Sequence, residues 1–123
     1  MCTLSAVNWG NVKKPGDFER ICRLAVRGLD VLLSYQNYPV LAAYNATMGR
    51  RPLGVGIINL AYFMAKNDMT YTSPNLSMID EYAEAWSYYL IKASADLAAE
   101  QGACGWNDQT KYSDGILPID TYK

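Results

Sequence analysis

The sequence predicts an α/β protein that is mostly helical and contains about two short strands. The main observation is a run at 53–58 that holds only apolar residues and glycine and lacks the polar alternation of a half-exposed strand. Such a run is typical of a central parallel strand covered on both faces, and it leads directly into a helical segment. Amphipathic segments before and after it favour helices laid on a sheet. Because a lone strand cannot satisfy its own backbone hydrogen bonds, we expect most of that sheet to come from outside this chain.

The composition fits one small domain, residues 1–123, with a single core. Apolar residues make up 50% of the chain and charged residues 19%, so it is neither disordered nor fibrous. Eleven lysines and arginines balance twelve aspartates and glutamates without a basic run, so we expect no nucleic-acid partner. The longest apolar run, 54–65, is too short to cross a bilayer, and no export signal is found at the N-terminus. We therefore expect a cytoplasmic protein without a membrane partner.

The cysteine and histidine content limits the chemistry. Cys2, Cys22 and Cys104 lie far apart and form no CxxC pair, which argues against a zinc site and against a secreted disulfide framework. The chain has no histidine, so it cannot build a Ser-His-Asp or Cys-His catalytic site. Any chemistry must therefore use a thiol, a carboxylate or a tyrosine.

A short strand is expected over 2–9, because residues that favour strands alternate loosely there. After a loop at 10–16, Asp17 is the expected N-cap of a helix that ends near 35–37, where Pro39 disfavours further helical residues. The predicted buried face of this helix holds Phe18, Ile21, Cys22, Ala25, Leu29, Leu32 and Leu33, and its polar side holds Arg20, Arg23, Arg27 and Asp30.

The middle of the chain predicts a helical or irregular connection over 40–48, the strand 53–58 and a helix over 58–66. The longest helix is expected to begin at Ser77, where an acidic residue three positions on suggests a capping box. It is expected to end at Gly102. Its apolar residues recur at steps of three and four: Ile79, Tyr82, Ala83, Trp86, Leu90, Ala93 and Leu97.

The remaining 104–123 is rich in turns, and Pro118 argues against a strand at 116–119 because proline has no backbone donor.

Two short motifs near the central strand have simpler structural explanations than ligand binding. Gly54 and Gly56 resemble the start of a dinucleotide-binding turn, but Asn59 replaces the third glycine and no second strand with an acidic end follows. Close backbone packing is the favoured explanation. Arg50 and Arg51 could hold a phosphate, but a solvated or salt-bridging pair is favoured.

The longest helix carries an acidic first part and an aromatic segment. Asp80 and Glu84 are one turn apart, which suits acid-base chemistry, although acidic residues at a helix N-terminus also stabilise the helix dipole. The aromatic residues most simply pack in a core or an interface; they are Tyr82, Trp86, Tyr88 and Tyr89.

The three cysteines differ in their surroundings. Cys22 and Cys104 stand among apolar neighbours and are predicted to be small buried residues. Cys2 opens the first predicted strand, where a thiol could face a cavity or another chain.

Several strings, in one order along the whole chain, carry a resemblance to a known family. On these strings the chain resembles the large (α) subunit of class I ribonucleotide reductase, of the bacterial and bacteriophage type. The strings are CTLSA at 2–6, YQNYP at 35–39, MGRRPLGVGIIN at 48–59, KAS at 92–94, EQGAC at 100–104 and GILPIDTYK at 115–123.

The resemblance implies a fold and a role. The matching region of that family is an internal piece from the middle of a ten-stranded α/β barrel, at the start of the second half-barrel. There, the cysteine that opens the CTLSA-like strand is one of two redox thiols that reduce the ribose and become a disulfide. That role carries over to Cys2 alone, with its disulfide partner on another chain.

The resemblance also implies partners. Other fragments of the large subunit would complete the enzyme, a ribonucleoside-diphosphate reductase that reduces ribonucleotides to deoxyribonucleotides. The family needs a radical-generating small subunit and a thioredoxin or glutaredoxin reductant, and no cofactor is expected on this chain itself. The other functional segments of the family have no counterpart here, so we expect the isolated chain to be inactive.

A methionine directly before Cys2 predicts the product of a gene split at that point. Two alternatives remain open. The chain could be a non-catalytic structural remnant or a helical interaction module derived from the same fold, or it could be an independent small helical domain. The last is disfavoured, because the faces of the central strand would leave a large apolar patch exposed.

Overall fold

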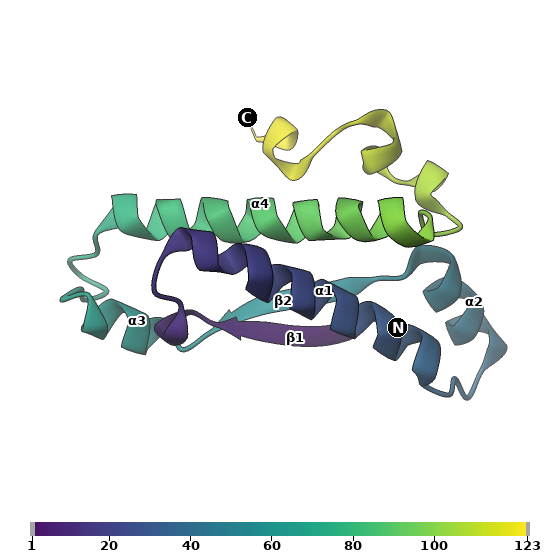
Figure 1. Cartoon of the computed structure of the whole chain (residues 1–123), viewed down its shortest axis with the longest axis horizontal. Coiled ribbons are helices and arrows are strands. Elements are labelled where there is room, and N and C mark those ends of the chain that lie inside the picture. The colour runs from purple at the N-terminus through teal and green to yellow at the C-terminus, as the bar shows by residue number, and fades with distance from the viewer. Residues whose placement is uncertain (1, 123) are drawn as a thin grey trace.

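The computed structural model describes residues 2–122 and confirms a mostly helical α/β chain with two short strands (Figure 1). Short 3-10 turns at 9–11 and 15–17 separate the first strand from the first helix, and others lie between 107 and 121. The strands are β1 (Thr3–Asn8) and β2 (Leu53–Ile58), and the helices are α1 (Phe18–Tyr35), α2 (Leu41–Arg50), α3 (Leu60–Lys66) and α4 (Leu76–Gln101).

The two strands form a parallel sheet. Thr3 lies opposite Leu53, and the register runs without a break to Asn8 opposite Ile58. The connection between them passes through α1, which packs on one face of the sheet, and α4 packs against α1. A parallel pair requires such a crossover, because the chain must return to the same end of the sheet before the second strand can begin.

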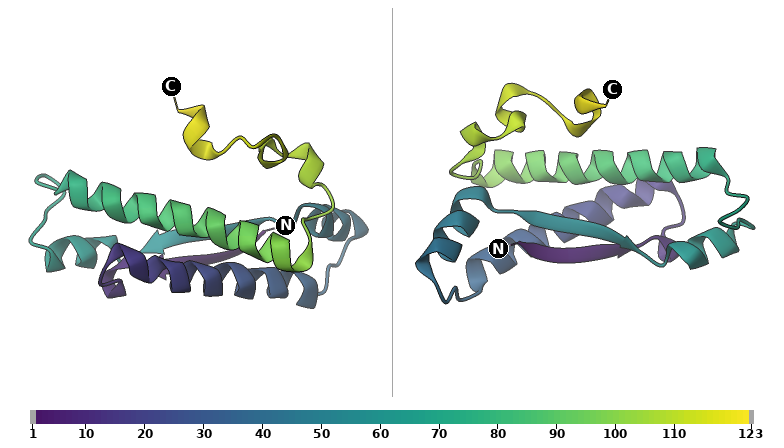
Figure 2. Two further views of the ribbon diagram at one scale, coloured as in Figure 1. Left: turned by 45° about the horizontal axis from the view of Figure 1, so that its top comes forward. Right: turned by 180° about the vertical axis from the view of Figure 1, so that it is seen from behind.

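The opposite face of the sheet is bare. Seen from behind, β1 and β2 lie in front of α1, α4 runs above them, and no other element of residues 2–122 covers this face (Figure 2, right). The prediction that 53–58 is covered on both faces is therefore wrong for this chain by itself, and Ile58 is 52% exposed. The position and type of the strand were predicted correctly; the second covering layer is missing from the described residues.

Helix α1 begins and ends as expected, but its buried face differs from the prediction at two positions. Val26 is buried on the core side, whereas Leu32 is half exposed. The expected N-cap bond of Asp17 is absent, because its carboxylate instead accepts the backbone N–H groups of Lys13 and Lys14 at 3.2 and 3.3 Å. Asp17 thus closes the preceding turn, which directs the chain from β1 into α1.

Asp30 is buried rather than on the polar side of α1, because it pairs with Arg51. The Arg51 guanidinium donates from Nε to Asp30 Oδ1 at 2.6 Å and from Nη2 to the Asp30 carbonyl at 2.8 Å and to Ser34 Oγ at 2.9 Å. Arg51 has a left-handed backbone, with φ of 44°. This contact, which we call the Arg51 clamp, holds the chain against α1 two residues before β2 begins.

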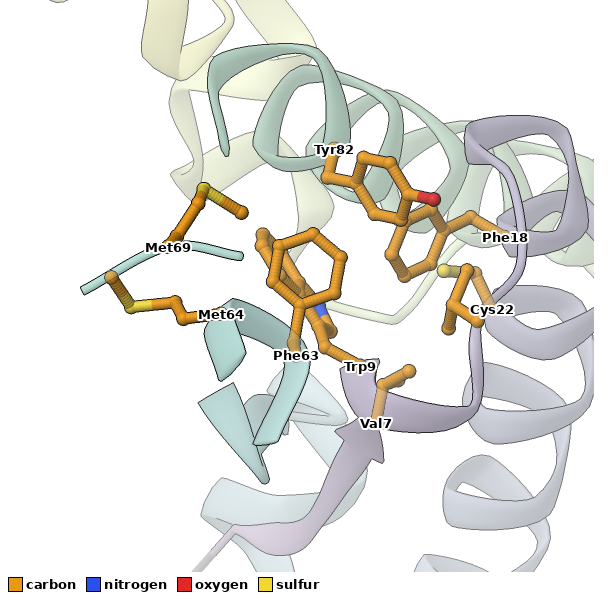
Figure 3. Packing of buried hydrophobic residues seen from close by; sticks show 9 residues of the cluster. Val7, Trp9, Phe18, Cys22, Phe63, Met64, Met69 and Tyr82 are labelled. Atoms are coloured by element: carbon orange, nitrogen blue, oxygen red, sulfur yellow. The ribbon is translucent and has the colours of Figure 1, made fainter. Parts of the chain in front are cut away.

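The core lies at the end of the sheet where β1 and β2 finish, which we call the far end, and it contains several aromatic side chains (Figure 3). Trp9, only 1% exposed, contacts Phe63 edge-on with ring centroids 5.5 Å apart, and Phe63 contacts Tyr82 at 4.8 Å. The phenol of Tyr82 donates to the Lys13 carbonyl at 3.0 Å, which gives its polar end a partner. The predicted packing role of Tyr82 is confirmed.

The ends of α4 are partly as predicted. Asn75, not Ser77, caps the N-terminus by accepting the Met78 N–H at 3.1 Å, so the expected capping box does not form. Gly102 ends the helix with φ of 90°, as expected of a residue without a Cβ. Beyond it, Trp106 packs on Gly49, and 116–119 contains no strand.

Replacing Arg51 by Met is expected to destabilise the chain by about 2–3 kcal/mol, because the buried Asp30 carboxylate loses its charged partner. Arg50→Met is the matched control, since Arg50 lies over the Trp106 ring at the surface. Chemical denaturation of the two variants and of the wild-type chain would measure the free energy of unfolding of each. Equal effects of the two substitutions would contradict the assigned role of the Arg51 clamp.

Candidate functional site

The candidate site is the Cys2 thiol, which lies directly before β1 and is exposed. Its Sγ makes one weak hydrogen bond, donated to the Thr3 carbonyl at 3.5 Å. An exposed thiol without a tight partner can reach a second sulfur, as thiol–disulfide exchange requires.

Cys2 belongs to the bare face of the sheet. Side chains alternate along a strand, and Thr3 and Val7 point toward α1, since Thr3 Oγ1 donates to the Leu29 carbonyl and Val7 lies in the core. Cys2 and Leu4 therefore point the other way, and Leu4 is 76% exposed. The thiol thus shares the uncovered face with Gly54, the residue opposite Leu4 in the neighbouring strand.

Contacts at both ends of the sheet determine where the thiol lies. At the far end, Asn59 donates to Asn8 at 3.0 Å, and Trp9 anchors β1 in the aromatic core. At the near end, the Arg51 clamp fixes the chain next to the start of β2, the strand that lies beside Cys2. Sequence reasoning missed this second contact, because Asp30 falls among the arginines on the polar side of the helical pattern.

The other two cysteines are poor candidates for the same role. Cys22 is completely buried, and burial raises the pKa of its thiol to about 11. Its Sγ lies 3.9 Å from the Trp86 carbonyl, inside the core. Cys104 is partly buried in the turn after α4. All three cysteines are free, and the prediction of a buried cysteine is confirmed for Cys22.

The remaining candidates do not gather around the thiol. Asp80 and Glu84 are exposed on α4 and form no ion pair in the described part of the chain. Of the two arginines considered for phosphate, Arg51 is salt-bridged and Arg50 stacks on Trp106, its guanidinium carbon 5.3 Å from the ring centroid. The salt-bridging explanation is thus confirmed for Arg51.

A hollow of the described surface lies away from this thiol. It measures about 740 Å³ and lies between the start of α1 and the middle of α4, and Cys2 is not among its lining residues. Its walls carry charges of both signs, including Arg20, Arg23, Lys92 and Asp96, so it offers no uniform field to one kind of ligand. The hollow is therefore a poorer candidate for a functional site than the Cys2 thiol.

Among residues 2–122, no three acidic, cysteine or histidine side chains come together where they could hold a metal ion. None of the described helices combines the length and the apolar character needed to cross a bilayer.

Comparison with known proteins finds similarity over the whole chain. The family model described as "Ribonucleotide reductase, barrel domain" matches residues 1–123. Proteins named ribonucleoside-diphosphate reductase subunit alpha are similar over the whole chain, with 50% identity in Haemophilus influenzae and 49% in Buchnera aphidicola from Acyrthosiphon pisum. The subunit alpha of Enterobacteria phage T4 is 41% identical over 99% of the chain. The chain spans only 16% of the length of each of these relatives.

In the native chain, we expect iodoacetamide to modify Cys2 rapidly and Cys22 only after unfolding, because Cys22 is buried and stays protonated until the pH approaches its raised pKa of about 11. Peptide mapping by mass spectrometry, from pH 7 to 10, measures the rate at each cysteine. Labelling in denaturant is the control, since there all three thiols are accessible. Modification of Cys22 at the Cys2 rate in the native chain would contradict this placement.

Proposed function

Since this chain belongs to the ribonucleotide reductase barrel-domain family, we propose that it supplies part of the barrel of a ribonucleoside-diphosphate reductase large subunit. In this proposal residues 1–123 form one partial barrel domain, which assembles with other fragments of the subunit. Its chemical contribution is Cys2, as one of two thiols that reduce the ribonucleotide.

The observation that supports this role is the face on which Cys2 lies. In α/β barrels the helices form an outer ring, so the side of a strand that carries no helix points inward. Here α1 covers one face of the sheet, and Cys2 lies on the other. When further strands close the barrel, this arrangement directs the thiol toward the interior, where a substrate would be enclosed.

In the proposed reaction, two thiols reduce the 2′ position of the ribose. The bond between the ribose 2′ carbon and its hydroxyl breaks, a carbon–hydrogen bond forms, and the oxygen leaves as water. The two thiols supply two electrons and two protons and become a disulfide. A thioredoxin or glutaredoxin then reduces this disulfide by thiol exchange.

The proposal takes the second thiol from another chain. It is supported by the burial of Cys22 in the core beneath the sheet and by the free state of all three cysteines. We therefore propose that the isolated chain is inactive, that its disulfide partner is on a second large-subunit fragment, and that the radical-generating small subunit acts on the assembled enzyme. The cytoplasm, where such reductants keep thiols reduced, is the compartment we propose.

The alternative is a structural remnant or interaction module that shares the fold without the chemistry. The weak hydrogen bond of the Cys2 thiol to the Thr3 carbonyl is compatible with that role, because it requires no chemistry of the sulfur. The two proposals differ in whether Cys2 is needed for turnover.

Cys2→Ser should abolish thioredoxin-dependent turnover of the reassembled enzyme and leave assembly intact, because serine preserves the shape of the side chain but cannot form a disulfide. Turnover of ribonucleoside diphosphate and gel filtration of the complex measure the two effects. Cys104→Ser is the matched control and should retain activity. Undiminished turnover in Cys2→Ser would favour the structural remnant.

When the tagged chain is purified from its native genetic context, we expect other segments of the large subunit to accompany it, because the bare sheet face and free strand edges need partners. Mass spectrometry of the purified material identifies these segments. Recovery of the chain alone, or as an aggregate, would count against assembly.

A further inference from the structure

The chain that follows α4 is attached to the end of α2 at Trp106. The Trp106 ring lies directly on Gly49, where a built Cβ would stand 2.6 Å from the ring atoms Cδ2 and Cε2. The backbone N–H of Trp106 donates to the Gly49 carbonyl at 2.8 Å. Since carbon atoms in ordinary contact are about 3.5 Å or more apart, any side chain at 49 would displace the ring. Only glycine at this position lets the ring and the backbone of Trp106 dock together.

The segment that Trp106 attaches, residues 103–122, is called the strap here. It leaves the end of α4 beside α2 and turns back above α4 (Figure 1). The side chains of residues 111–122 are all exposed. Apart from the Trp106 amide, the described residues show one hydrogen bond between the strap and the rest of the chain, in which Arg50 donates to Gln109 at 3.5 Å. Trp106 is therefore the main anchor of the strap.

Docking of the strap also completes the C-terminus of α2. Because α2 ends at Arg50, the Gly49 carbonyl is one of the last four, which have no partner within the helix. The Trp106 N–H supplies that partner. Another of these carbonyls, that of Thr47, accepts the Arg51 N–H at 2.7 Å. The last turn of α2 is thus held by the strap and by the residue that forms the clamp.

The anchor of the strap and the Arg51 clamp are adjacent. Gly49 receives the strap, and two residues later Arg51 pairs with Asp30. The hydrogen bond with Asp30 is the main cause of the raised pKa of the Arg51 guanidinium, and Cys104 of the strap adds a smaller contribution, so the strap lies beside the clamp. Fraying of the last turn of α2 would move the backbone that directs the guanidinium toward Asp30.

We propose that the strap is a conformational device with a docked and a released state. Docked through Trp106, it caps α2 and keeps the Arg51 clamp closed; released, it loosens the turn that leads into β2. Docking and clamp closure are coupled, and such coupling is reciprocal. The state of the strap thereby reaches the end of the sheet beside Cys2. The inference goes beyond the proposed function, because it concerns only contacts within this chain.

Hydrogen exchange of backbone amides, followed by NMR on the full chain, measures both contacts separately. The Trp106 amide reports docking of the strap, and the Arg51 amide reports the end of α2. Gly49→Ala forces the ring away, although alanine itself favours the helix. Gly105→Ala is the matched control, because a Cβ there would meet only the Gly49 carbonyl oxygen, at 4.0 Å.

We expect Gly49→Ala to lower the protection of the Trp106 amide by about tenfold or more, because the whole contact is lost. The Arg51 amide should lose about three- to tenfold, the usual effect of one hydrogen bond. Gly105→Ala should leave both amides unchanged.

The reciprocal experiment weakens the clamp and observes the strap. Arg51→Met should lower the protection of the Trp106 amide by about threefold or more, because coupling acts in both directions. The loss is measured relative to the Phe63 amide, which donates to the Asn59 carbonyl at the far end of the sheet and reports general destabilisation.

Unchanged protection of the Trp106 amide in Gly49→Ala would overturn the proposal, since the ring would then not be the anchor. A lower protection at Trp106 with an unchanged Arg51 amide would overturn it as well, because the two contacts would be independent. An equal effect of Gly105→Ala would do the same. Circular dichroism shows whether Gly49→Ala is folded; if it is not, Trp106→Leu replaces it, keeps the N–H at 106 and should lower the protection of the Arg51 amide likewise.

Discussion

The parallel register between β1 and β2 is the constraint on which the rest of the structure depends. Pairing Thr3 with Leu53 sends Val7 and Val55 toward the helices, and Cys2 and Gly54 to the bare face. A shift of one residue in β1 would invert this pattern and place the thiol beneath α1. The register therefore determines both the core of the chain and the side on which chemistry is available.

Two unlike contacts hold that register, one at each end of the ladder. At the far end the aromatic core fixes Trp9 directly after β1, mainly through burial and edge-to-face ring contacts. At the near end the Arg51 clamp attaches the start of β2 to α1 through charge-assisted hydrogen bonds. The clamp depends on a buried charge and on directional hydrogen bonds, so it fixes β2 at the end that lies beside Cys2.

The sequence predicts the elements well, because apolar periodicity and proline positions are local signals. Strand 53–58 and the end of α4 at Gly102 follow from them directly. The pairing of Asp30 with Arg51 joins residues 21 positions apart, and no local pattern encodes it. No local pattern encodes the approach of Cys2 to Gly54 either, because it depends on the register between the two strands. The string resemblance singled out Cys2, but only the paired strands show which way its sulfur points.

The bare face connects folding with function. Parallel sheets are almost always covered on both faces, so a two-stranded sheet with Leu4 and Ile58 exposed is an incomplete unit. The surface that lacks a partner is also the one that carries the thiol. Cys22, on the covered face, is completely buried, and burial raises the pKa of its thiol. Whatever completes the sheet would therefore also enclose the thiol, so the proposed assembly and the proposed thiol chemistry would use the same surface.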